Sequence, residues 1–155
     1  MSTQLAMDLG VDEYVQDVEI VLSLQDRAFE LIRSGKKKFE FRRKWRPDPC
    51  LAYIYRSGKI KGLAARMTLG SPIYGTPAEI GEIAEKAIPG NGVSVEEYLA
   101  KTNGGCAIPI VNFCEFRLIS LTELRALSFH PPQYFFYLAP HIRLKALLEE
   151  RLSEK

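Results

Sequence analysis

Apolar residues change their spacing several times along the chain, and the first change separates a strand from a helix. Residues 19–24 form a short apolar run of the kind that a strand shows. Ser23, followed three residues later by Asp26, predicts the capping box of a helix, and Gly35 predicts its end. The first segment of the chain is therefore expected to be a strand followed by a helix.

A spacing of two replaces the helical spacing directly after this helix. In residues 38–43 apolar and charged side chains alternate, which is typical of a half-buried strand with its polar groups in a row. Residues 51–56 and 60–69 are two further strand candidates, and the short loop between them contains a glycine. These segments predict a meander of three strands.

The middle of the chain has a helical pattern. Thr76 and Glu79 combine an N-cap with a capping-box glutamate, and a proline stands in the first turn. A second, shorter helix is expected from Ser94, and the Asn-Gly-Gly sequence at 103–105 predicts its end. We therefore expect two consecutive helices here.

The last third of the chain returns to strand-like patterns. Residues 106–118 predict a long strand, in which Pro109 indicates an edge or a bulge because proline cannot donate to a ladder. Residues 133–138 predict a last strand, and Pro140 predicts the start of a terminal helix.

The order of these elements decides the fold class. Five or six short strands interleaved with helices, without regular strand–helix–strand alternation, predict an α+β protein. We expect a small mixed β-barrel with peripheral helices rather than a doubly wound sheet. The expected organisation is an acidic N-terminal segment over residues 1–18, one domain over residues 19–138 and a C-terminal helix over residues 139–155.

Charge is distributed unevenly, although the net charge of the 155 residues is only +2. Residues 1–24 carry five acidic and no basic side chains, whereas residues 25–66, the basic strip, carry 13 basic and 4 acidic ones. Within residues 33–46, eight basic residues accompany Glu40 alone. The basic strip favours a polyanionic partner that the net charge would not predict, and a solvated charged face is the ordinary alternative.

Cysteine and histidine offer little for a metal site. Cys50, Cys106 and Cys114 have no CxxC spacing, and His130 and His141 have no evident catalytic partner, so neither a metal nor a cofactor is expected. The odd number of thiols and the lack of a secretory signal predict a cytoplasmic protein. No apolar run reaches the roughly 18 residues that a membrane helix needs, so no membrane partner is expected.

A GxKxxExR motif, with its glycine at position 35, lies between the first helix and the second strand. In this strand–helix–strand context the motif resembles the signature of the ASCH domains, which are relatives of the PUA fold. The resemblance extends to the helical insert that begins TPAEI and to the closing HPPQYFFYL, and it covers roughly residues 19 to 138. The subgroup that the sequence most resembles is the one described as predicted transcriptional regulators.

The resemblance implies a small β-barrel whose cleft is walled by helices and lined by the motif. ASCH relatives are viewed mainly as RNA-binding or RNA-processing modules, some of them ribonucleases, and one branch hydrolyses the amide of acetylated cytidine. In that branch a lysine and a nucleophilic threonine do the chemistry. Lys37 matches the lysine, but Glu40 stands at the nucleophilic position and Lys38 at that of a second threonine. Amide hydrolysis is the less favoured alternative, because a carboxylate cannot replace a hydroxyl nucleophile.

The residues of the motif support a binding site on their own chemistry. Glu40 and Arg42 are expected about 6–7 Å apart on one strand face, with Lys37 at the turn before them. An arginine fork and a lysine beside one carboxylate can hold a phosphate or a base edge. The same three residues are equally compatible with a structural ion-pair network, and the sequence leaves both interpretations open.

Aromatic residues near the basic strip favour single-stranded RNA, because bases stack on aromatic rings while phosphates meet cations. Tyr53 and Tyr55 share one strand face, and at least one of them is expected in the barrel interior; Trp45 follows the densest basic run. The candidate nucleic-acid-binding residues are Lys37, Lys38, Glu40, Arg42, Arg43, Tyr55, Arg66 and Gln133.

Two other functions remain open besides RNA binding. A metal-independent ribonuclease could use Glu40 as the base for a 2′-hydroxyl and Lys37 as a catalytic cation. A regulatory role could instead use the acidic N-terminal segment, which could cover the basic strip, or the terminal helix.

Overall fold

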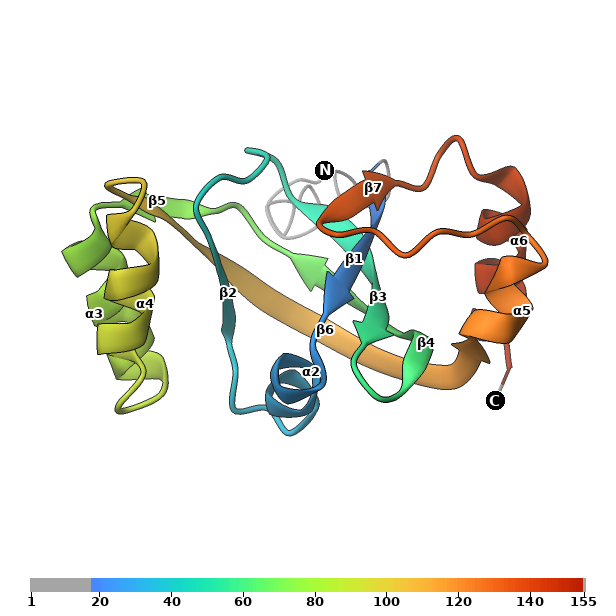
Figure 1. The fold of residues 1–155 in the computed structure, drawn as a ribbon, viewed down its shortest axis with the longest axis horizontal. Coiled ribbons are helices and arrows are strands. Elements are labelled where there is room, and N and C mark those ends of the chain that lie inside the picture. Colours follow the sequence, from blue (N-terminus) through green and yellow to red (C-terminus); the bar gives the residue numbers. More distant parts are fainter. Residues whose placement is uncertain (1–17, 155) are drawn as a thin grey trace, which may run out of the picture.

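Seven strands form one curved sheet within residues 18–154, the part of the chain that this computed structural model describes (Figure 1). The strand order is β2-β6-β4-β3-β1-β7, and β5 pairs with β6 off this path. β1 and β3 are parallel, and the other pairs are antiparallel. The strands are β1 (Glu19–Leu24), β2 (Phe39–Arg42), β3 (Cys50–Ser57), β4 (Lys61–Leu69), β5 (Ile73–Gly75), β6 (Gly105–Ser120) and β7 (Phe135–Tyr137).

Helices pack on both faces of this sheet and gather at its two ends (Figure 1). α2 (Asp26–Arg33) follows β1 and packs against the sheet. α3 (Pro77–Ala87) and α4 (Gly92–Ala100) pair at one end, whereas α5 (Leu121–Arg125) and α6 (Ile142–Leu152) lie at the other. The sheet curls into an open half-barrel, so the expected α+β class with a mixed sheet and peripheral helices is confirmed.

Alternating side chains of the strands build one core on each face of the sheet, and a third core joins α3 and α4 to β2 and β6. On the α2 face, Phe29 and Ile32 pack with Ile54 of β3. On the opposite face, Tyr55 and Leu63 pack with residues from α5 and α6. Full burial of such a side chain contributes about 1.5–3 kcal/mol relative to exposure, so the two cores fix which face each strand residue occupies.

The expected helix caps are confirmed at one position and wrong at another. Thr76 forms the expected capping box with Glu79 at the start of α3. Ser23 instead lies within β1, and its hydroxyl donates to the carbonyl of Pro132 at 2.6 Å. α2 begins after Gln25, which makes no side-chain capping bond. Because β1 pairs with β3 and β7, Ser23 belongs to a strand and cannot be the helix cap that the local pattern predicted.

The expected meander of three strands is wrong, because β2 pairs with β6 and not with β3. Other element boundaries differ from the expectations by a few residues. α4 begins at Gly92 rather than at Ser94, and α6 begins at Ile142 rather than at Pro140. β5 and α5 were not expected, because each is too short to show a period. A capping box at Ser120 does mark the start of α5.

Pro109 lies inside a central strand and not at an edge, so that expectation was wrong. Its carbonyl accepts a hydrogen bond from the backbone N–H of Gly70 at 2.9 Å. This side of β6 therefore faces residues 70–72, which join β4 to β5 and form no strand. The ladder has a gap there, and no strand partner needs the N–H that proline lacks.

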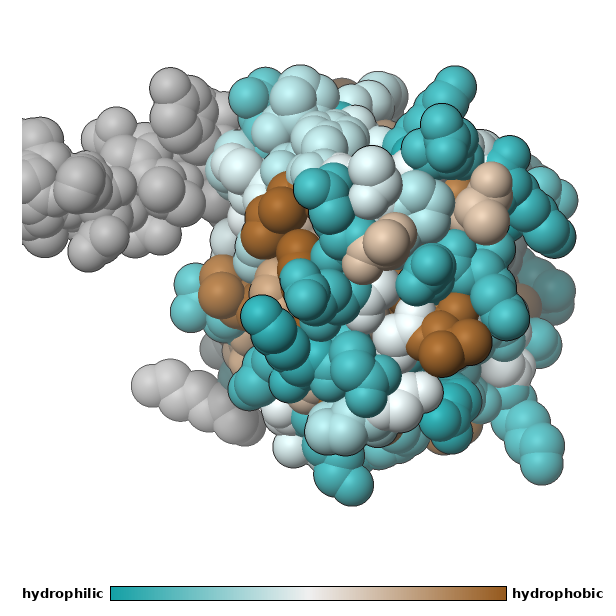
Figure 2. Space-filling model, turned by 90° about the vertical axis from the view of Figure 1, so that its left-hand side faces the viewer, coloured by the Kyte–Doolittle hydropathy of each residue, from teal (hydrophilic) through white to brown (hydrophobic). Residues whose placement is uncertain are grey.

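The end of the molecule that α3 and α4 form is mostly hydrophilic, with hydrophobic side chains in separate spots (Figure 2). None of the helices within residues 18–154 is long and apolar enough to cross a membrane. The acidic N-terminal segment lies almost entirely outside the described residues, since these begin at position 18.

Candidate nucleic-acid interface

The turn after α2 brings the motif residues onto β2. Gly35 has a φ of +80°, a left-handed conformation that glycine adopts without strain. The backbone N–H groups of Lys36 and Lys37 both donate to the carbonyl of Leu31 at 2.9 Å, which closes the helix end. The chain leaves this turn directly into β2, so the turn sets the position of Lys37 beside the strand.

Glu40 holds Lys37 and Arg42 together in a mostly buried ion-pair cluster. The Nζ of Lys37 lies 3.5 Å from one carboxylate oxygen of Glu40, and a terminal nitrogen of Arg42 lies 2.7 Å from the other. The Nε of Arg42 donates to that second oxygen at 3.0 Å. The three side chains are only 10–16% exposed. Low exposure strengthens such contacts relative to surface ion pairs.

Arg42 also lies against two aromatic rings. Its guanidinium carbon is 5.2 Å from the ring centre of Tyr134 and 5.9 Å from that of Trp45, both within the range of cation–π attraction. Tyr134 directly precedes β7, so the last strand segment brings this ring to β2. Glu40 and the two rings together fix the orientation of the Arg42 side chain.

Two tyrosine hydroxyls hold the loop that follows β2. Tyr134 donates to the carbonyl of Lys44 at 2.6 Å, and Tyr74 donates to the carbonyl of Trp45 at 2.9 Å. Burial raises the pKa of both tyrosines, so both phenols remain protonated donors at neutral pH. The indole N–H of Trp45 is buried without a partner among the described residues.

A pocket of about 340 Å³ opens beside Arg42, between Tyr134 and Tyr98 of α4. The guanidinium of Arg43 lies 4.2 Å from the ring centre of Tyr98 and donates to the carbonyl of the same residue at 3.2 Å. Tyr98 and Tyr134 are each 39% exposed, so both rings are accessible to a ligand. We call these four residues and Lys44 the cation–aromatic pocket.

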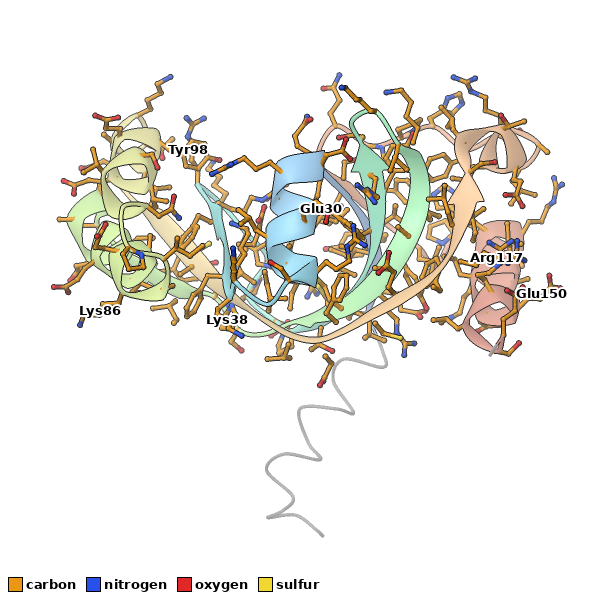
Figure 3. The ribbon with its side chains drawn as sticks, turned by 90° about the horizontal axis from the view of Figure 1, so that it is seen from below. Glu30, Lys38, Lys86, Tyr98, Arg117 and Glu150 are labelled. Carbon is orange, nitrogen blue, oxygen red and sulfur yellow. The ribbon has the colours of Figure 1, made fainter. Side chains whose placement is uncertain are left out.

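A second hollow, of about 290 Å³, lies at the other end of β2. Lys37 and Lys38 line it, together with the turn at Gly35 and residues 110–113 of β6. Figure 3 shows Lys38 at one end of β2 and Tyr98 near the other. The motif thus links two hollows along one strand, with the Glu40 cluster between them.

The structure brings most of the predicted site residues together on or beside β2. Lys37, Glu40, Arg42 and Arg43 contact one another or the cation–aromatic pocket, and Lys38 lines the second hollow. Gln133 is exposed directly before Tyr134 and therefore lies next to the pocket in the chain.

Tyr55 and Arg66 are placed elsewhere. Tyr55 is 1% exposed and lies 5.4 Å from Phe129, ring centre to ring centre, in the core that α5 and α6 cover. Arg66 pairs across the strands with Tyr53, on the same face as Tyr55, whereas the partners of Glu40 and Arg42 on β6 belong to the α2 core. Neither side chain reaches the motif, because the sheet separates the two faces.

The basic strip is also not one continuous surface. Arg56 is buried, and it pairs with Asp26 and Glu30 of α2 at 3.2 Å. Arg33 pairs with Glu30 as well. The Arg56 pairs stabilise the packing of α2 on the sheet, whereas the Arg33–Glu30 pair lies within α2. Part of the excess positive charge is therefore already compensated.

Sequence reasoning missed the two tyrosines that complete the pocket. Tyr134 follows the candidate residue Gln133, and Tyr98 lies in a segment whose pattern predicts only a helix. Their exposure beside a cationic strand depends on tertiary packing. In the sequence, only the presence of aromatic residues together with basic ones could have indicated these two tyrosines. Within residues 18–154, no group of three or more His, Cys, Asp or Glu side chains could hold a metal ion.

Comparisons with known proteins show which fold this is. The sequence matches no family model and no curated protein. The structure of ASCH from Zymomonas mobilis has a TM-score of 0.71 and 23% identity, and the match covers 84% of this chain and 94% of that one.

Two mutant forms of the Zymomonas protein give the same result. One has a TM-score of 0.72 and 23% identity, covering 84% of this chain and 95% of that one. The other has a TM-score of 0.71 and 22% identity, covering 83% and 96%. The chain therefore has the curled half-barrel fold of the ASCH structures.

Proposed function

We propose that this protein binds single-stranded RNA along β2, with the cation–aromatic pocket as the site for a base and its phosphate. The observation that carries the proposal is the fixed position of Arg42. A terminal nitrogen of Arg42 lies 2.7 Å from a carboxylate oxygen of Glu40, and its guanidinium carbon lies 5.2 Å from the ring centre of the exposed Tyr134. An arginine that is already oriented loses little side-chain entropy when it meets a phosphate.

The two exposed tyrosines suit unpaired bases. Tyr98 and Tyr134 both line the pocket, and an arginine guanidinium lies against each ring: Arg43 against Tyr98 and Arg42 against Tyr134. Stacking on such rings contributes about 1–3 kcal/mol per base. A base inside a duplex is already stacked on both sides, so the pocket favours single strands.

Exposed lysines extend the site along the strand. Lys38 and Lys44 are exposed beyond opposite ends of β2, so RNA that runs along β2 would place phosphates near both. If about four phosphates are neutralised, the logarithm of the affinity falls with that of the salt concentration at a slope near −3.

The geometry around Glu40 favours binding over cleavage. Both of its oxygens already contact a cation, and the side chain is only 10% exposed. A general base must reach the 2′-hydroxyl within hydrogen-bond distance, and a carboxylate held between Lys37 and Arg42 is poorly placed to do so. Glu40 therefore acts as a positioning residue for the two cations.

The fold and the thiols support the wider setting of this proposal. ASCH structures share the half-barrel, and the motif resemblance to the subgroup of predicted transcriptional regulators agrees with a regulator that acts by binding RNA. Cys50, Cys106 and Cys114 are all free thiols, which suits a reducing compartment such as the cytoplasm.

Fluorescence anisotropy with a labelled single-stranded RNA of about 12 nucleotides, within the usual range for such sites, tests the proposal. The variant with Arg42→Gln and Arg43→Gln should bind at least tenfold more weakly. The matched control carries Lys59→Gln and Lys61→Gln, which remove the same charge from the exposed β3–β4 turn and the first residue of β4. Equal losses in the two variants would show that bulk charge, and not the pocket, binds RNA.

A further inference from the structure

A third hollow, of about 730 Å³, lies between the end of α5, the start of α6 and the loop that precedes β7. It is at the opposite end of the sheet from α3 and α4, and therefore from Tyr98 and the cation–aromatic pocket (Figure 1). Its volume lies within the range of small-molecule sites, roughly 300–1,000 Å³. Nothing in the proposed RNA site uses it.

The turn after α5 builds the floor of this cavity. Ser128 has a φ of +61°, and the backbone N–H of Phe129 donates to the carbonyl of Leu124 at 3.3 Å. This turn directs Phe129 into the core, where its ring centre lies 5.4 Å from that of Tyr55 and 6.0 Å from that of Phe136. The floor is thus a packed aromatic cluster, which gives the cavity a fixed apolar surface.

Basic groups surround this apolar floor. Both histidines of the chain, His130 and His141, line the cavity together with Arg143. The ring centre of His141 is 4.6 Å from that of Phe136, so it continues the aromatic cluster toward the opening. None of the residues that line the cavity is acidic. The arrangement complements a ligand with an apolar body and a negative end.

The first turn of α6 adds to this preference. The helix starts at Ile142 without a capping side chain and without an acidic residue in its first turn. Its free N–H groups and dipole favour an anion. The partial positive charge at the N-terminus of α6 therefore has the same sign as the charge of Arg143.

From the cavity, its floor and its basic rim, we propose that this site binds a small monocarboxylate with an aliphatic or aromatic body. The body packs on Phe129 and Phe136, and the carboxylate accepts hydrogen bonds from Arg143 and a histidine ring. Guanidinium–carboxylate pairs of this kind are short and directional. A nucleic acid fits less well, because it would have to place a charged phosphate over an apolar floor.

Isothermal titration calorimetry with three probes separates the contribution of the apolar body to binding from that of the carboxylate. Octanoate carries both the apolar body and the carboxylate, 1-octanol carries only the body, and acetate carries only the charge. Octanoate should bind at least tenfold more tightly than either of the other two. Equal binding of octanoate and octanol would overturn the role of the basic rim, and no binding of octanoate would overturn the proposal.

Variants at exposed residues test the location without endangering the fold. Ile142 is 77% exposed and lines the cavity, so Ile142→Glu and Ile142→Gln differ only in charge there. Ile142→Glu and Arg143→Gln should each weaken octanoate binding about tenfold, whereas Ile142→Gln should have a smaller effect. Lys86→Gln, on α3 at the other end of the molecule, is the charge control (Figure 3). Octanoate binding that is equal in all four variants would place the site elsewhere.

Discussion

Replacing Glu40 by glutamine separates the positioning of Arg42 from the charge of the site. The change keeps the shape of the side chain and removes the charge that Lys37 and Arg42 share. Charged hydrogen bonds contribute about 1.5–3 kcal/mol, whereas exposed ion pairs contribute about 0–1 kcal/mol. Because these side chains are 10–16% exposed, we expect a loss near the middle of the higher range, about 2 kcal/mol.

This loss is measurable by thermal unfolding. For a chain of this length, 1 kcal/mol corresponds to about 2–4 °C in Tm, so Glu40→Gln should lower Tm by about 4–8 °C. Glu82→Gln is the matched control, because Glu82 is exposed on α3. A Glu40→Gln variant with the Tm of this control would show that the cluster does not stabilise the fold.

The same variant gives an RNA-binding result that simple electrostatics does not predict. Glu40→Gln adds one positive unit to the site, which by charge alone would tighten RNA binding. Ordering a long side chain on binding costs about 0.5–1.5 kcal/mol, which corresponds to a factor of about 2 to 12. We therefore expect weaker binding once Glu40 no longer holds Arg42. Tighter binding would refute the positioning role.

Three further variants test other parts of the structure. Tyr134→Leu should weaken RNA binding about fivefold or more in anisotropy, since stacking contributes about 1–3 kcal/mol per base; unchanged affinity would remove Tyr134 from the site. Thr76→Ala should lower the free energy of unfolding in urea by about 1 kcal/mol, because the α3 capping box is lost. The pKa of Asp26 is held below its ordinary value of 3.8, chiefly by the backbone N–H of Lys59 and also by Arg56. A carboxylate with a lowered folded-state pKa stabilises the fold above its unfolded pKa, and this stabilisation is lost as the pH falls through the folded value. The unfolding free energy of Asp26→Asn should therefore decrease less below pH 3.8 than that of the unmodified protein, and parallel curves would contradict this.

The sequence predicted the motif strand well because its signal is local. A period of two places Glu40 and Arg42 on one face, and the structure finds them there, joined through a direct ion pair. The sequence is compatible with either a ligand site or an ion-pair network, and the structure contains the network. It is the basis of the binding proposal, since the carboxylate orients the arginine.

Features that depend on distant partners could not be predicted in the same way. Tyr134 and Tyr98 reach the pocket from 92 and 56 positions beyond Arg42, respectively, through the packing of β7 and α4. Tyr55 was a candidate because a period of two does not say which face meets which helix, and α5 and α6 cover its face. Ser23 matched a cap locally, but strand pairing extends through it.

The central claim is that single-stranded RNA binds at the cation–aromatic pocket. Photo-crosslinking tests this claim most directly. RNA that contains 4-thiouridine would be crosslinked to the unmodified protein, and the modified peptides would be identified by mass spectrometry. We predict crosslinks in the peptides that contain Tyr98 and Tyr134, which decrease when Arg42 and Arg43 are both changed to glutamine. Crosslinks confined to α5, α6 and the loop before β7 outside Tyr134 would contradict the account.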